Sequence, residues 1–109
     1  MAAKRHTFII PESGTESNEV ALDGRSIGLW SLPAMTGTSL ALQHKNEAGA
    51  WGALLDENET AITLTAAAAA RQRRMKPEQT HLCGSVRLVS NGTEAAARTI
   101  YAYSDSFVE

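Results

Sequence analysis

The sequence predicts an all-β domain, built as a sandwich or a barrel, on two observations. Residues that favour turns recur at short intervals along the 109-residue chain. The runs between them alternate apolar and polar residues with the period of two that is typical of half-buried strands. Short strands that begin roughly every 8–12 residues are characteristic of sandwiches and barrels. The length fits one domain over residues 1–109.

The expected strands are separated by residues that favour turns, mainly glycine, proline, asparagine and aspartate. Asp23-Gly24 and Asn91-Gly92 are hairpin signals. The other turns are expected at 11–14, 33–38, 46–49 and 56–58. The strands expected between the turns are 7–10, 19–22, 25–32, 39–44, 51–55, 61–65, 85–90 and 97–103.

The strand 25–32 carries a prediction about its two faces. Period two places Ile27 and Leu29 together on one face. The same period places Trp30 and Leu32 on the opposite face.

The stretch 39–51 is interpreted as a hairpin whose turn lies at 46–49. Leu40, Leu42 and Trp51 are expected to face the core. His44 follows on the face of the two leucines, at the end of the strand. We therefore expect a structural role for this histidine rather than a catalytic one.

The segment 65–76 has two interpretations. Its alanines, the cations near its end and Pro77 favour a short helix near 65–72. The segment lacks the wide apolar stripe from which helices gain most of their stability. A loop followed by a strand is therefore the preferred interpretation. That strand would place Arg71, Arg73 and Met75 opposite Gln72 and Arg74.

The residues that carry chemistry form no recognisable site. Cys83 is the only cysteine, which excludes an intramolecular disulfide, and we expect it to be a small buried hydrophobe. The histidines lack the spacing of a metal site, no serine lies in a nucleophile elbow, and no glycine-rich phosphate loop is present. We expect neither an enzyme nor a bound cofactor or metal.

The net charge and the hydropathy of the chain indicate which classes of partner are not expected. The net charge is −2, without the high pI usual for a nucleic-acid-binding domain, and no apolar stretch approaches the roughly 18 residues of a membrane span. Neither nucleic acid nor a membrane is expected as a partner.

The basic run 71–76 is open to three interpretations: a solvated surface, an interface for an acidic protein, or a nucleic-acid patch. Trp30 and Trp51 are expected in the core, with an exposed sugar-stacking ring as the alternative.

Several stretches resemble known proteins. Residues 10–24, 38–43, 48–51 and 97–100 are similar to motifs in small proteins of tailed bacteriophages and prophages. The hairpin 44–51 and the segment Ser85-Val-Arg-Leu88 resemble the discoidin, or galactose-binding, jelly roll. The resemblance implies an eight-stranded antiparallel jelly-roll β-sandwich. It also implies a cement, or decoration, protein of a phage capsid.

On this resemblance we expect a structural virion protein that binds the outer surface of the major capsid protein. It would be made in the host bacterial cytoplasm, located on the capsid exterior, and often homodimeric. An N-terminal arm over 1–10 and a C-terminal tail over 104–109 would take part. The alternative is a carbohydrate-binding module of a phage fibre or host-recognition protein. The expected interface residues are Lys4, Arg5, Phe8, Ile9, Arg71, Arg73, Arg74, Tyr101, Tyr103 and Phe107.

Overall fold

A computed structural model describes residues 3–80 and 83–106 of the chain. Nearly all of the regular secondary structure in the described part is β-strand, as the alternating pattern predicts. The exception is one short 3-10 turn, η1 (Pro77–Gln79), which lies between β7 and β8. The strands are β1 (Lys4–Ile10), β2 (Val20–Ala21), β3 (Arg25–Leu32), β4 (Ser39–Lys45), β5 (Trp51–Ala53), β6 (Thr63–Thr65), β7 (Arg71–Arg74), β8 (Ser85–Ser90) and β9 (Arg98–Ser106).

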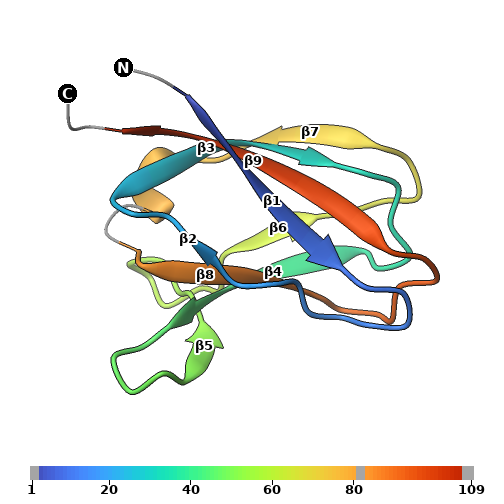
Figure 1. Ribbon diagram of the computed structural model, residues 1–109, viewed down its shortest axis with the longest axis horizontal. Helices are drawn as coiled ribbons and strands as arrows, with labels where there is room; N and C mark the ends of the chain where they lie inside the picture. The colour runs from blue at the N-terminus through green and yellow to red at the C-terminus, as the bar shows by residue number, and fades with distance from the viewer. Residues whose placement is uncertain (1–2, 81–82, 107–109) are drawn as a thin grey trace.

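Two antiparallel sheets pack face to face (Figure 1). Sheet A has the strand order β1-β9-β3-β7, and sheet B has the order β2-β8-β4-β5, with β6 also paired to β4. Most consecutive strands belong to opposite sheets, so the chain winds around the sandwich in the manner of a jelly roll. The predicted all-β sandwich is confirmed.

The strands β5 and β6 occupy a single position beside β4. The strand β5 pairs with residues 43–45 of β4, and β6 pairs with residues 39–41. Between them the chain leaves the sheet as the excursion 54–62. Leu54 N–H donates to the Leu42 carbonyl, and Leu42 N–H donates to the Ile62 carbonyl. The excursion therefore interrupts one position of an eight-position jelly roll.

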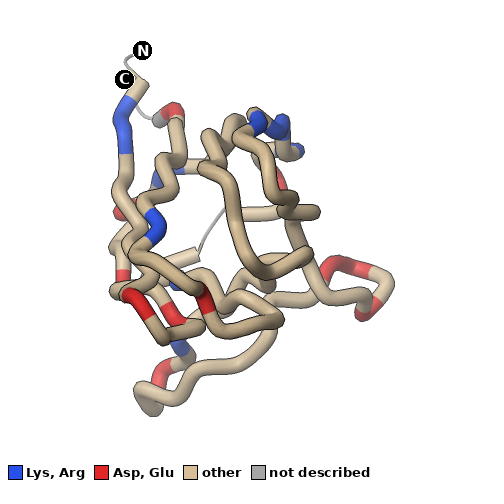
Figure 2. The backbone as a smooth tube through the Cα atoms, turned by 90° about the vertical axis from the view of Figure 1, so that its right-hand side faces the viewer, with Lys and Arg blue, Asp and Glu red and all other residues tan. Residues whose placement is uncertain are grey.

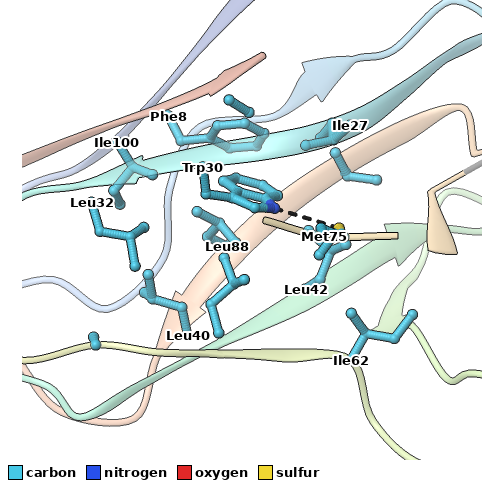
Figure 3. Packing of buried hydrophobic residues seen from close by; sticks show 14 of the residues in the cluster. Phe8, Ile27, Trp30, Leu32, Leu40, Leu42, Ile62, Met75, Leu88 and Ile100 are labelled. Atoms are coloured by element: carbon cyan, nitrogen blue, oxygen red, sulfur yellow. Dashed lines mark hydrogen bonds between the residues drawn. The ribbon is translucent and has the colours of Figure 1, made fainter. Parts of the chain in front are cut away.

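The core fills the space between the two sheets, and Trp30 lies at its centre (Figure 3). Trp30 is fully buried against Phe8, with ring centroids 5.3 Å apart. Its indole N–H donates to the Met75 sulfur at 3.4 Å. The buried aliphatic side chains come from both sheets, among them Ile27, Leu42 and Leu88. The prediction that Trp30 anchors the core is confirmed.

A bulge in β3 changes the faces that period two predicts. The pairing of β3 with β9 shifts register between Ile27 and Leu29. A bulge adds one residue to the strand and reverses the alternation beyond it. Ile27 and Trp30 therefore both point into the core, and Leu29 turns to the outside. The prediction that Ile27 and Leu29 share a face was wrong.

The preferred interpretation of 65–76 as a loop followed by a strand is confirmed, because the alanines 66–70 have no regular structure and residues 71–74 pair with β3 as strand β7. The short helix considered near 65–72 does not form. Two other expectations need correction. Residues 4–10 are not an arm, because they form β1, pair with residues 98–104 of β9 and bury Phe8 and Ile10. Residues 104–106 belong to β9 rather than to a tail.

A buried carboxylate holds the loop 33–38 against the connection between β8 and β9. The Glu94 carboxylate accepts hydrogen bonds from Thr36 N–H (2.8 Å) and Gly37 N–H (2.9 Å). It also accepts from the Ser90 hydroxyl and from Arg98 Nε, both at 2.9 Å. A Cβ at residue 37 would collide with the Ser90 hydroxyl, so the loop needs glycine there.

Candidate functional site: the outer face of sheet A

The outer face of sheet A brings residues from four separate strands into one surface. One row of paired residues crosses the sheet from Arg5 through Tyr103 and Leu29 to Arg74. In an antiparallel sheet, residues in register point to the same face. We call this surface the tyrosine face, and its members are Arg5, Thr7, Ile9, Leu29, Ser31, Gln72, Arg74, Thr99, Tyr101 and Tyr103.

The two tyrosines lie at the centre of this face, on β9. Tyr101 and Tyr103 are half-buried, because neighbouring side chains cover their rings in part. The Arg5 guanidinium lies over the Tyr101 ring, 4.7 Å from its centroid. Ile9 extends the apolar surface and is 46% exposed. The face therefore offers rigid aromatic area beside a positive charge.

A shallow depression lies at one end of the tyrosine face. Its volume is about 410 Å³, and its lining includes Leu29, Arg74 and Tyr103. Pro77 and Asp105 line the rest of its rim, with Ala3, Ser26, Gly28 and Ser104. A partner's side chain that enters here would meet apolar carbon beside both an arginine and a carboxylate.

Sheet A is the basic side of the molecule. Its strands carry Lys4 and Arg5 in β1, Arg25 in β3, three arginines in β7 and Arg98 in β9. Asp105 is the one acidic residue in these strands. Most other carboxylates lie on loops, away from the cations of β1 and β7 (Figure 2). Charge is therefore separated within a chain whose net charge is only −2.

The sequence-predicted interface residues fall into three groups. Five of them lie together on the tyrosine face: Arg5, Ile9, Arg74, Tyr101 and Tyr103.

Lys4, Arg71 and Arg73 lie on strands of sheet A but point to its other side. They are in register with Ser104, Leu32 and Trp30, whose side chains are buried between the sheets. Lys4 and Arg71 are nevertheless exposed, because they lie near the margin of the sandwich.

Phe8 does not belong to the surface, since its side chain is fully buried against Trp30. Its assignment to an interface was wrong. Phe107 lies outside the described residues. The interface prediction missed five members of the face: Thr7, Leu29, Ser31, Gln72 and Thr99. The bulge in β3 made the face of Leu29 unpredictable, and the four polar residues carry no signal of their own.

The opposite sheet carries the second tryptophan on its outer surface. Trp51 is in register with Lys45 and is half-buried outside the core, so the expectation that it faces the core was wrong. The Arg87 guanidinium lies 4.5 Å from a Trp51 ring centroid, and Lys45 Nζ lies 5.7 Å from it. Arg87 also pairs with Glu16 and with Gln43, at 3.2 and 2.8 Å. These contacts hold the ring in place.

The described histidines and the cysteine have structural surroundings. His44 Nε2 accepts a hydrogen bond from Gly84 N–H at 3.2 Å, which agrees with the structural role expected for it. His6 is buried and shares a 2.7 Å hydrogen bond with the Ser104 hydroxyl. Burial, followed by the nearby charges of Lys4 and Arg25, lowers the pKa of His6. Cys83 is buried, as expected, and burial raises the pKa of its thiol.

Within residues 3–80 and 83–106, no group of histidine, cysteine, aspartate or glutamate side chains is arranged to hold a metal ion. The described chain also contains no helix long and apolar enough to cross a membrane.

Comparisons with known proteins show the fold. No family model and no curated protein sequence matches the chain. Among solved structures, the SPBc2 prophage-derived protein YomS is similar with a TM-score of 0.51 and 10% identity, over 95% of each chain. The Yersinia pseudotuberculosis-derived mitogen has a TM-score of 0.42 and 10% identity, over 99% of this chain and 88% of its own. The chain thus shares the all-β fold of a prophage-derived protein along nearly its whole length.

Proposed function

We propose that this chain is a structural virion protein of a tailed bacteriophage, a decoration protein that binds the major capsid protein through its tyrosine face. The observation that carries the proposal is the composition of that face. Tyr101 and Tyr103 lie at its centre, and Arg5 and Arg74 stand on either side of them. Tyrosine and arginine are the residue types that most often dominate the energetics of protein interfaces.

The proposed contact would be stabilised by burial of side-chain surface and would involve no chemical reaction. Tyrosine rings on a sheet lose little conformational entropy when a partner covers them, because the sheet already restricts their rotamers. The excess of cations on sheet A would steer the chain toward an acidic surface of a capsid subunit. The similarity of the fold to that of a prophage-derived protein supports a phage origin.

The site of action in this proposal is the capsid exterior. A decoration protein that pairs as a homodimer would present the tyrosine face twice. Two linked contacts with neighbouring capsid subunits raise the overall affinity, because the second contact forms at a high effective concentration.

The alternative of a carbohydrate-binding module receives no support from the two tryptophans. Sugar stacking requires an accessible aromatic face. Trp30 has no exposed surface. Trp51 has the Arg87 guanidinium stacked 4.5 Å from its ring. Neither tryptophan therefore presents a free platform for stacking on a sugar.

The test is co-sedimentation of the purified chain with expanded capsids that lack it. We expect the wild-type chain to pellet with the capsids and to raise the temperature at which they release their contents. The double variant Tyr101→Ala/Tyr103→Ala removes the centre of the face. Loss of two interfacial hot-spot side chains predicts binding weakened by about thirtyfold or more.

The matched control is Trp51→Ala, which removes an aromatic side chain from the outer face of sheet B. We expect this variant to bind capsids like the wild type. A wild-type chain that stays in the supernatant would contradict the proposal. Equal losses of binding in the tyrosine and tryptophan variants would contradict the assignment of the face.

A further inference from the structure

We propose that the free edge of β7 is a second binding site, which accepts an extended acidic segment of a partner protein as an added strand. This inference goes beyond capsid binding by the tyrosine face. It concerns backbone hydrogen bonding at an edge rather than burial on a face, and it holds whatever the tyrosine face binds.

On its outer side, the backbone of β7 has N–H and C=O groups that face no neighbouring strand. The strand lies at the edge of sheet A and pairs only with β3. Met75 N–H donates to the Gly28 carbonyl at 3.1 Å. Backbone groups of an antiparallel strand point alternately to the two sides. Arg71 and Arg73 therefore bond to β3, and the N–H and C=O groups of Gln72 and Arg74 point away from the sheet.

The other edges are closed or interrupted. On β1, the side chain of Asn18 occupies the edge as a strand would. Its Oδ1 accepts from Ile9 N–H at 2.7 Å, and its Nδ2 donates to the Thr7 carbonyl at 3.2 Å. On sheet B, the excursion 54–62 divides one edge, and β2 is only two residues long. Exposed edges are templates for strand addition, and proteins commonly block them in these ways. Among the described residues, no side chain or excursion covers the edge of β7; the protection of this four-residue strand is the charge of its three arginines, which acts against another basic strand.

The positive charge of β7 favours an acidic partner strand over a second copy of β7. Arg71, Arg73 and Arg74 form no ion pair with any carboxylate of the described chain. A second copy of β7 would place arginine opposite arginine, and like charges directly across a strand pair are destabilising. An acidic strand would instead place carboxylates beside Arg71 and Arg73, which share one side of β7. Access is open, because the exposed residues 68–70 before the strand are alanines.

The probe is a blocked synthetic peptide about six residues long, the length of a typical strand, with alternating glutamate and valine. Binding is followed by NMR with the isotope-labelled full chain. We expect the amides of Gln72 and Arg74 to shift on titration and to exchange with solvent at least about tenfold more slowly, because they become hydrogen-bonded. The amides of Arg71 and Arg73 are already bonded within the sheet and should exchange as before.

Charge reversal tests the selection. We expect the double variant R71E/R73E, which leaves Arg74 of the tyrosine face unchanged, to bind the glutamate peptide at least about tenfold more weakly, since like charges now face each other. The same variant should gain affinity for a peptide with lysine in place of glutamate. The matched control is Arg5→Glu, which reverses a charge on the tyrosine face at the opposite edge of the sheet. It should leave peptide binding unchanged.

Three results would overturn the inference. One is a lysine peptide that binds the wild-type chain as well as the glutamate peptide does. Another is a peptide that shifts Tyr101 and Tyr103 but not Gln72 and Arg74. The third is self-association of the chain through β7, detected by sedimentation, in the absence of peptide. The capsid test is independent of all three, because it uses tyrosine variants whose β7 edge is unchanged.

Discussion

Removal of the Glu94 carboxylate should destabilise the fold more than any other single change to a polar side chain described above. In Glu94→Ala, the backbone N–H groups of Thr36 and Gly37 lose their acceptors, in a partly buried environment for Thr36 and a buried one for Gly37. Each orphaned donor costs about 1–3 kcal/mol. Arg98 has 21% of its side chain exposed and can turn toward solvent, which limits its share of the loss. We expect a total of about 3–5 kcal/mol, the range seen when one partner of a buried pair is removed.

The variant Glu94→Gln should fall between the wild type and Glu94→Ala. Glutamine keeps one carbonyl oxygen, which can still accept from backbone N–H groups. Its amide nitrogen replaces an oxygen that accepts from a donor in the wild type, so one hydrogen bond becomes a repulsive contact. Equilibrium unfolding in urea, followed by tryptophan fluorescence, measures the difference. With a slope of about 1–3 kcal/mol per molar urea, the alanine variant should lower the midpoint by about 2 M.

The pH dependence of the free energy of unfolding gives a second comparison between the wild type and Glu94→Gln. Burial alone would raise the pKa of Glu94, but hydrogen bonds from Thr36, Gly37, Ser90 and Arg98 outweigh it and lower the pKa below its ordinary value of 4.5. A lowered pKa in the folded state stabilises the fold above the unfolded value, and this stabilisation is lost as the pH falls through the folded value. The stability difference between the wild type and Glu94→Gln should therefore be greatest above pH 4.5 and should narrow in acid.

The reasoning about Glu94 would be refuted if Glu94→Ala unfolded within about 1 kcal/mol of the wild type, the size of an ordinary surface substitution. Glu57→Gln, at an exposed position in the excursion 54–62, is the control. It should leave the urea midpoint unchanged.

Three further predictions concern other parts of the molecule. In urea unfolding, Trp30→Ala should destabilise the fold by about 3–5 kcal/mol, whereas Trp51→Ala should destabilise it by about 1 kcal/mol or less. Equal losses of stability in the two variants would contradict the assignment of only one tryptophan to the core. The lowered pKa of His6 means that the folded state binds a proton less readily than the unfolded state. The free energy of unfolding should therefore fall as the pH drops from 6.5 toward the folded pKa. Unfolding curves of His6→Gln, measured over the same pH range, should show a weaker pH dependence. Asn18→Ala should uncover the edge of β1 and produce concentration-dependent self-association by light scattering, and a variant that stays monomeric would contradict the role of the asparagine as an edge block.

Local patterns predicted the hairpin between β4 and β5, but not the direction of its tryptophan. Asn46 and Gly49 form the turn as expected, with Gly49 at a φ of 85°. Leu40 and Leu42 are buried as expected. The register across the turn places Trp51 opposite Lys45, which points outward. A shift of one residue in a loop moves every following side chain to the other face, and a sequence pattern alone does not determine that shift.

The tyrosine face could be predicted only in part, because it depends on pairing between distant segments. Period two requires the neighbours Phe8 and Ile9 to point to opposite faces once their segment is a strand. Expecting both at an interface followed from treating that segment as an arm. Thr7 lies beside Tyr101 because β1 pairs with β9. Nothing in either segment alone indicates the other as its partner.

The place of β9 in sheet A has a consequence for synthesis of the protein. This strand is the last in the described chain, yet it lies between β1 and β3 and joins them. On the ribosome, the nascent chain therefore has no strand partner for β1 until residues 98–104 have emerged. Pairing between such distant segments also folds slowly, because the ends of a long loop must meet first. Cells that make this protein must keep its apolar early strands from aggregating until β9 has been synthesised.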